Sequence, residues 1–151
     1  MKKIQTCLWF DGNGHEAAEF YVSIFKNYGD TRLTGSFPGP DGKPLAATFR
    51  LAGADYMAIN GGTYYKLTPA VSISVDCETQ QEIDEYWEKL LAGGEPSRCG
   101  WLTDRFGLSW QIVPTLLPKL LQDPVRGPKA MGAVMGMVKL DIQQIEAAAN
   151  A

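Results

Sequence analysis

The side chains that could do chemistry begin with a single histidine, His15. With one imidazole the chain cannot build a metal cage from several histidines, and a Ser-His-Asp or Cys-His nucleophilic site would depend on His15 alone. His15 falls at the start of a predicted helix, so we interpret it as a solvated first-turn residue. The sequence therefore argues against histidine-dependent catalysis.

Three cysteines, Cys7, Cys77 and Cys99, are the remaining candidate nucleophiles. Their number is odd, they are widely spaced and they form no Cys-x-x-Cys pair, so we expect free thiols in a reducing cytoplasm. Cys7 and Cys99 could line a pocket, where a thiol is a nucleophile if its pKa is lowered. A small buried apolar group is the alternative interpretation.

Three tryptophans could stack on a flat ligand, namely Trp9, Trp101 and Trp110. Trp110 shares strand parity with Ile112, which favours core packing for it. Trp101 is therefore the better pocket candidate.

Bulk composition limits the classes of partner. The chain has 151 residues and a net charge of −3, which fits one domain or two small halves and argues against nucleic acid. Residues 1–10 lack the apolar core of a signal peptide, and we find no run of about 18 apolar residues that would span a membrane. We expect a soluble cytoplasmic protein.

The elements that must position these side chains occur twice. Residues 4–10 alternate as a strand, with Ile4, Leu8 and Phe10 on one face. Asn13 and Glu16 then form a capping box for a helix over about 14–28, with an apolar stripe. Residues 70–75 repeat the strand, with Val71, Ile73 and Val75 on one face, and Thr79 and Glu82 repeat the cap for a helix over 79–92.

Each helix is followed by three further predicted strands, so the unit βαβββ is used twice. Strands are predicted at 31–37, 46–51 and 56–60, and again near 95–99, 100–104 and 108–113. Two loops, 36–44 and 60–66, either flank a binding site or serve as simple connections. The residues from 104 to 107 indicate a hairpin turn.

The tail changes character after residue 114. Leu116 to Leu121 predicts a short helix, Met131, Val134, Met135 and Val138 form a second stripe, and a last helix begins at Ile142. These helices would pack on the sheets or on a partner subunit. We expect a glyoxalase-like domain over residues 1–114, with modules of about 1–66 and 67–114, and a helical extension over 115–151.

Two segments carry a family resemblance. Residues 8–21 (LWFDGNGHEAAEFY) and residues 99–114 (CGWLTDRFGLSWQIVP) resemble the PhnB-like family, which is often labelled 3-demethylubiquinone-9 3-methyltransferase, of the glyoxalase/bleomycin resistance (vicinal oxygen chelate) superfamily. The resemblance implies an α+β fold in which two βαβββ modules form a curved cup that holds a ligand. A methyltransferase of the Rossmann type would need a glycine-rich loop after the first strand and a parallel sheet, and we expect neither.

In metal-bearing members of the superfamily, His and Glu side chains from four cup-facing positions hold a divalent ion. By similarity these positions are Gln5, Ala58, Ala70 and Gln111 here. Because they carry no charge, we predict no metal and no other cofactor. The ligand-binding residues that we predict for the cup are Gln5, Cys7, Trp9, Ala58, Asn60, Ser72, Ser74, Cys99, Trp101 and Gln111.

The favoured function is the binding of a small molecule in a metal-free cup. The alternatives are a glyoxalase-like enzyme, with isomerase, lyase or transferase chemistry on an unknown substrate, and a structural or regulatory dimer. We expect a homodimer, because the stripe from Met131 to Val138 needs a cover.

Overall fold

The computed structural model describes residues 3–151, which form two compact units that divide between Leu67 and Thr68. The first unit contains, in chain order, β1 (Thr6–Phe10), α1 (Gly14–Phe25), β2 (Arg32–Pro38), β3 (Pro44–Leu51) and β4 (Ala54–Asn60). The second contains β5 (Ser72–Cys77), α2 (Gln80–Leu91), β6 (Glu95–Pro96), β7 (Trp101–Thr103), β8 (Ser109–Pro114), α3 (Leu116–Leu121), α4 (Arg126–Val134) and α5 (Ile142–Ala149).

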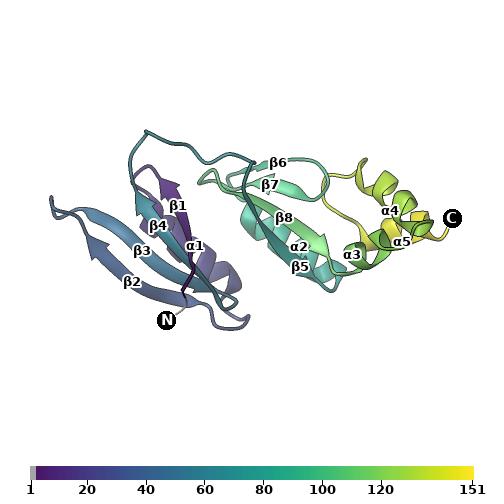
Figure 1. The fold of residues 1–151 in the computed structure, drawn as a ribbon, viewed down its shortest axis with the longest axis horizontal. Coiled ribbons are helices and arrows are strands. Elements are labelled where there is room, and N and C mark those ends of the chain that lie inside the picture. The colour runs from purple at the N-terminus through teal and green to yellow at the C-terminus, as the bar shows by residue number, and fades with distance from the viewer. Residues whose placement is uncertain (1–2) are drawn as a thin grey trace. The chain divides into compact units, whose positions relative to one another are not determined.

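The two units repeat one topology, visible in Figure 1 as a helix lying against a four-stranded sheet. The strand order is β1-β4-β3-β2 in the first sheet and β5-β8-β7-β6 in the second. In each sheet the first strand is parallel to the last, and the other pairs are antiparallel. The predicted α+β class, with two βαβββ modules and C-terminal helices, is confirmed.

In the first unit α1 covers one face of its sheet. Its buried residues include Ala17 and Tyr21, and the sheet supplies Leu8, Phe10 and Phe49 from alternate positions. The phenyl ring of Phe49 lies 6.1 Å from the Tyr21 ring, centroid to centroid. The prediction that Ile4 joins this face is wrong, because the strand begins only at Thr6 and Ile4 is exposed.

In the second unit α2 buries Ile83, Trp87 and Leu90 against its sheet, whose inward side chains include Trp110 and Ile112. Trp87, like Phe25 of α1, is buried, as the helical stripes predict. Val71 is 63% exposed, because it precedes β5 and has no place on the inward face. The prediction for Val71 is therefore wrong.

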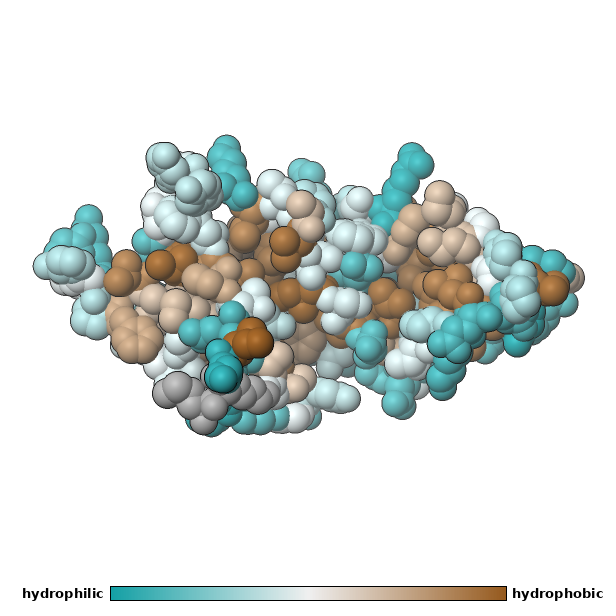
Figure 2. Space-filling model, in the orientation of Figure 1, coloured by the Kyte–Doolittle hydropathy of each residue, from teal (hydrophilic) through white to brown (hydrophobic). Residues whose placement is uncertain are grey.

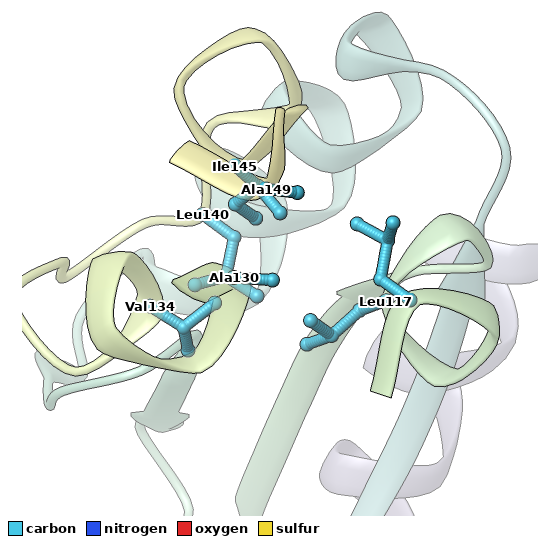
Figure 3. Close-up of a cluster of buried hydrophobic side chains, with 7 residues drawn as sticks. Leu117, Ala130, Val134, Leu140, Ile145 and Ala149 are labelled. Carbon is cyan, nitrogen blue, oxygen red and sulfur yellow. The ribbon is translucent and has the colours of Figure 1, made fainter. Parts of the chain in front are cut away.

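The C-terminal helices build a small core of their own. Figure 3 shows Leu117, Ala130, Val134, Leu140, Ile145 and Ala149 converging, and all of them are buried. Backbone bonds from Cys99 N to Met137 O and from Gly100 N to Val138 O, each 2.8 Å, tie the connection between α4 and α5 to the residues just before β7. The predicted stripe is divided: Val134 points into this core, whereas Met131, Met135 and Val138 are exposed.

The two main helices are capped differently. Thr79 Oγ1 accepts the Glu82 amide at 3.1 Å, as predicted for α2. The side chain of Asn13 makes no cap bond, although α1 begins directly after it. Asn60 at the end of β4 takes that role, since its Oδ1 accepts the Gly14 amide at 2.7 Å. The local cap predicted for α1 is thus replaced by one from a distant strand.

Candidate functional site

Each sheet has a second face that its own main helix does not cover. Side chains alternate along a strand, and residues opposite each other in register point the same way. In the second sheet Trp110 and Ile112 face α2, so Gln111 and its register partners Ser74 and Trp101 lie on the other face. We call this the open face of the second sheet.

Neutral hydrogen-bonding groups dominate the middle of that open face. Gln111 Nε2 donates to Ser72 Oγ at 2.9 Å, which joins β8 to β5. Ser109 is 1% exposed, and its hydroxyl has no hydrogen-bond partner among residues 3–151. The neutral polar residues of this face are Ser72, Ser74, Thr103, Ser109 and Gln111, with Trp101 beside them, and the carboxylates of Asp76 on β5 and Glu95 on β6 lie at its two edges.

The open face of the first sheet is less polar. It carries Cys7 and Trp9 of β1 and their register partners Met57 and Ile59 of β4. Partial burial raises the pKa of the Cys7 thiol, which keeps it protonated at neutral pH and makes it a poor nucleophile. Cys7 is nevertheless exposed, so the alternative interpretation as a small buried apolar group is wrong as well.

Trp9 is held in place by the segment that follows β4. Its indole N–H donates to Gly62 O at 3.0 Å, and its ring meets the Tyr65 ring edge-on at a centroid distance of 4.9 Å. A Cβ atom on Gly61 would lie 2.1 Å from the Trp9 ring, so only glycine allows this approach. Trp9 is therefore a fixed aromatic surface, half covered by its own chain.

Paired charges end the open face of the first sheet. Arg50 contacts Asp55 at 2.6 Å and Asp30 at 2.7 Å, and Arg32 contacts Asp30 at 3.0 Å. Hydrogen bonds from Arg50 and Arg32 lower the pKa of the Asp30 carboxyl. Each charge already has a counter-charge, so this cluster offers no spare group for acid–base chemistry.

Two of the four positions that similarity suggested for a metal lie in each unit, and three of the four are not on the open face of a sheet. Gln5 precedes β1 and is exposed, and Ala70 lies in a turn before β5. Ala58 is 0% exposed and faces α1, since a Cβ atom on Gly14 would lie 3.3 Å from its methyl group. The expectation that Ala58 lines the open face is corrected, because its strand parity is that of Leu8. Only Gln111 lies on a strand of the open faces.

Two other residues that we predicted to bind the ligand, Cys99 and Asn60, instead contact other parts of their own unit. Cys99 adopts a positive φ of 62° and packs beside the C-terminal core, before β7 begins. Asn60 uses both ends of its amide, accepting from Gly14 N and donating to Pro44 O at 3.1 Å. Of the predicted set, the structure brings together Ser72, Ser74, Trp101 and Gln111 in the second sheet, and Cys7 and Trp9 in the first.

The residues present do not fit the divalent metal of the superfamily. Within residues 3–151, no group of three or more His, Cys, Asp or Glu side chains is placed to hold a metal ion. The open face of the second sheet supplies mainly hydroxyls and one amide, which are weak donors, and its two carboxylates, Asp76 and Glu95, stand apart on the edge strands β5 and β6. We therefore derive no chemical step through a metal.

Asp104 holds the turn between β7 and β8 in place through its carboxylate. It is 3% exposed, and its Oδ1 accepts the amides of Phe106 at 2.8 Å and Leu108 at 3.1 Å. Its Oδ2 accepts the indole N–H of Trp110 at 2.8 Å. The predicted turn is confirmed, and Asp104 fixes β8, the strand that carries Ser109 and Gln111.

Sequence reasoning missed two residues of the open face, Thr103 and Ser109. The signal was available for Ser109, because it shares strand parity with Gln111 in a strand whose other face is apolar. Thr103 stands opposite Ser109 in register, and no sequence pattern announces that pairing.

The expectation that no glycine-rich loop follows the first strand is wrong. Gly12, Gly14 and Ala17 do follow the first strand in the spacing Gly-x-Gly-x-x-Ala of dinucleotide-binding loops. The setting differs, since β1 belongs to a mixed four-stranded sheet and Asn60 already occupies the Gly14 amide. Gly14 is needed for packing, because its Cβ atom would lie 2.7 Å from Asn60 Oδ1. Both sheets formed within residues 3–151 are mixed, as the prediction of no parallel sheet requires.

These features define a protein of the glyoxalase-like, vicinal oxygen chelate fold. Residues 2–113 match the family described as 3-demethylubiquinone-9 3-methyltransferase, and the chain belongs to that family. The match ends before α3, so the three C-terminal helices lie beyond it.

Solved structures agree with this assignment. The PhnB protein from Bacillus cereus is 31% identical, with a TM-score of 0.67 over 76% of this chain and 100% of its own. Protein PA1353 from Pseudomonas aeruginosa shares the fold at 22% identity, with a TM-score of 0.62 over 76% of this chain and 98% of its own. The fosfomycin resistance protein FosX from Listeria monocytogenes, solved with Mn(II) and sulfate, shares it at 18% identity, with a TM-score of 0.56 over 74% of this chain and 92% of its own. No curated protein matches the chain.

Proposed function

We propose that this protein binds a small, uncharged, polar molecule on the open face of β5, β8 and β7, without a metal ion. The observation that carries the proposal is the group of neutral donors and acceptors on that face. Such a face suits the hydroxyl, carbonyl or amide groups of a metabolite-sized ligand. Trp101 adds a flat apolar surface against which a ring or chain can rest.

The unpartnered hydroxyl of Ser109 supports the proposal. A buried polar group without a hydrogen bond costs about 1–3 kcal/mol, so native proteins rarely leave one unexplained. A ligand oxygen or N–H that displaced the atoms covering Ser109, which is 1% exposed, would recover that cost. Gln111 and Ser72, already bonded to each other, would orient the ligand with their remaining donors and acceptors.

The FosX structure contains Mn(II), and its low identity carries over only the fold. For this chain we propose binding in place of metal-assisted catalysis, because the centre of the face around Gln111 is neutral, and its two carboxylates, Asp76 and Glu95, lie on the opposite edge strands β5 and β6. The methyltransferase description of the family gains no support from the site, which lacks the cofactor-binding architecture of a Rossmann-type methyltransferase.

Thermal unfolding against a panel of neutral hydroxylated, carbonyl and amide compounds tests the proposal. We expect at least one compound to raise the unfolding temperature of the native chain and of a Gln143→Leu control on α5, but not of Gln111→Leu. A stabilising compound that works equally well on Gln111→Leu would place binding elsewhere.

Elemental analysis of the untagged protein tests the metal-free part. We expect less than one equivalent of zinc, nickel, iron or manganese per chain. A stoichiometric metal that is lost in Gln111→Ala would contradict the proposal and would favour an enzyme of the glyoxalase type.

A further inference from the structure

A hollow of about 560 Å³ lies in the first unit, where three connecting segments meet. Asp11 and Gly12 come from the β1–α1 loop, Gly39 and Lys43 from the β2–β3 turn, and Asn60 from the end of β4. Its volume falls within the range of about 300–1,000 Å³ that is usual for small-molecule sites. It shares no residue with the neutral face of β5, β7 and β8, so it is a separate site.

The walls of this hollow are tied together before any ligand arrives. The Asn60 side chain links the start of α1 to Pro44, with bonds of 2.7 Å from Gly14 N and 3.1 Å to Pro44 O. The turn is closed by a bond of 2.7 Å from Gly39 N to Lys43 O. A ligand would therefore meet a preformed site and would pay little to order it.

The charges around the hollow are of both signs, and two of them are unused. Among residues 3–151, the Asp11 carboxylate and the Lys43 ammonium group form no ion pair. Asp41, also in the wall, accepts the Lys43 backbone amide at 3.0 Å through Oδ1 and keeps its second oxygen for another donor. Two carboxylates and one ammonium group make the wall complementary to a ligand that carries both charges.

We propose that this hollow binds a small zwitterion, a molecule with an ammonium group and a carboxylate a few bonds apart. The ammonium group lies against Asp11 and Asp41, and the carboxylate pairs with Lys43. The glycines in the wall bring the backbone close to the ligand, because no side chain stands in the way. At Gly12 a Cβ atom would meet nothing within 4 Å, so the space beside its backbone is open.

Three probes of matched length test the assignment by ¹⁵N–¹H NMR titration of the labelled protein. They are 4-aminobutyrate, with both charges, butylamine, with the ammonium group alone, and butyrate, with the carboxylate alone. We expect 4-aminobutyrate to shift the amides of residues 11–14, 39–45 and 60–62 at the lowest concentration. Loss of either charge should weaken binding roughly threefold to tenfold, the range for exposed to partly desolvated ion pairs.

Variants separate the charges from the shape of the site. Asp11→Asn should weaken the binding of 4-aminobutyrate and butylamine but not of butyrate. Lys43→Gln should weaken the binding of 4-aminobutyrate and butyrate but not of butylamine. Leu45→Trp keeps the charges and fills the hollow, so it should weaken 4-aminobutyrate as well. Lys26→Gln, at the far end of α1, is the matched control and should change none of these affinities.

Two results would overturn the proposal. One is an absence of shifts in the wall residues with all three probes at high millimolar concentration. The other is an equal response to 4-aminobutyrate and to a single-charge probe, which would show that one half of the charge pairing does not exist. Neither result bears on the neutral face of the second sheet, whose test uses Gln111 variants and uncharged compounds.

Discussion

At the scale of single residues, the buried carboxylate of Asp104 positions the strand that carries the proposed ligand-binding side chains. Asp104 gathers two backbone amides and an indole N–H within one turn, and so sets where β8 begins. Its contribution is structural and local. Because β8 carries Ser109 and Gln111, a substitution of Asp104 would displace these side chains of the open face by shifting the strand.

Asp104→Ala should therefore destabilise the protein by about 3 kcal/mol or more, because it strands three N–H donors, each costing about 1–3 kcal/mol when buried and unpaired. Urea unfolding followed by tryptophan fluorescence measures this loss. Asp41→Ala, in an exposed turn where Asp41 accepts one backbone amide, is the control and should cost less than about 1 kcal/mol. Equal effects for the two variants would show that the Asp104 bonds contribute little.

Cys77 provides a prediction about pH. Burial, followed by the nearby charges of Glu82 and Asp76, raises the pKa of its thiol to about 12. Below the ordinary thiol pKa both folded and unfolded chains keep the proton, so the full stability is present. Above it the unfolded chain ionises first, and stability should fall as the pH rises towards about 12. Urea midpoints of native and Cys77→Ala protein at increasing alkaline pH should converge, whereas parallel slopes would contradict the assignment.

At the scale of elements, the two modules share an order of strands and helices but solve the same problem at the helix N-terminus in different ways. Thr79 caps α2 from the adjacent position, whereas α1 borrows its cap from β4. The sequence shows the same motif in both places, Asn13 with Glu16 and Thr79 with Glu82. Only the tertiary structure distinguishes them.

Alanine substitutions should reveal this difference. Thr79→Ala should cost about 1 kcal/mol, the usual loss for a side-chain cap, and Asn13→Ala should cost clearly less. Asn60→Ala should cost more than either, because it removes both the Gly14 and the Pro44 bonds. Chemical denaturation of the three variants measures the order, and a loss for Asn13 equal to that for Asn60 would contradict it.

Periodicity predicts most of the fold, because apolar stripes and alternating strands arise from burial on one side. The stripes of α1 and α2 and the inward residues of β8 follow this rule. The rule fails at the ends, as at Ile4 and Val71, where the chain has left the sheet before the pattern stops. It also cannot assign Ala58 to a face, since a small apolar residue suits either side and only the register with Leu8 decides.

At the scale of the whole molecule, the surface of the C-terminal helices bears on assembly. None of the helices within residues 3–151 has the length and hydrophobicity that crossing a bilayer requires. The C-terminal helices nevertheless leave apolar side chains exposed, and Figure 2 shows hydrophobic atoms among hydrophilic ones in this part of the surface. We propose that these side chains pair two copies of the chain.

Light scattering at micromolar concentration should give the mass of a dimer. Met135 is 60% exposed next to Met131 at 39% and Val138 at 48%, so Met135→Glu would place a charge in the proposed contact. It should shift the mass towards the monomer, whereas Lys119→Glu on α3 should not. A monomeric native protein would refute the proposal.

The distant cap of α1 also has a consequence during synthesis. Asn60 follows Gly14 by 46 residues, and a ribosome adds roughly 5–20 residues per second. The first helix therefore waits roughly two to nine seconds between its own emergence and the arrival of the strand that completes it, with its apolar stripe uncovered. The second helix carries its own cap, Thr79, although its apolar stripe also waits for β8. The first module therefore stays incomplete until Asn60 has emerged from the ribosome.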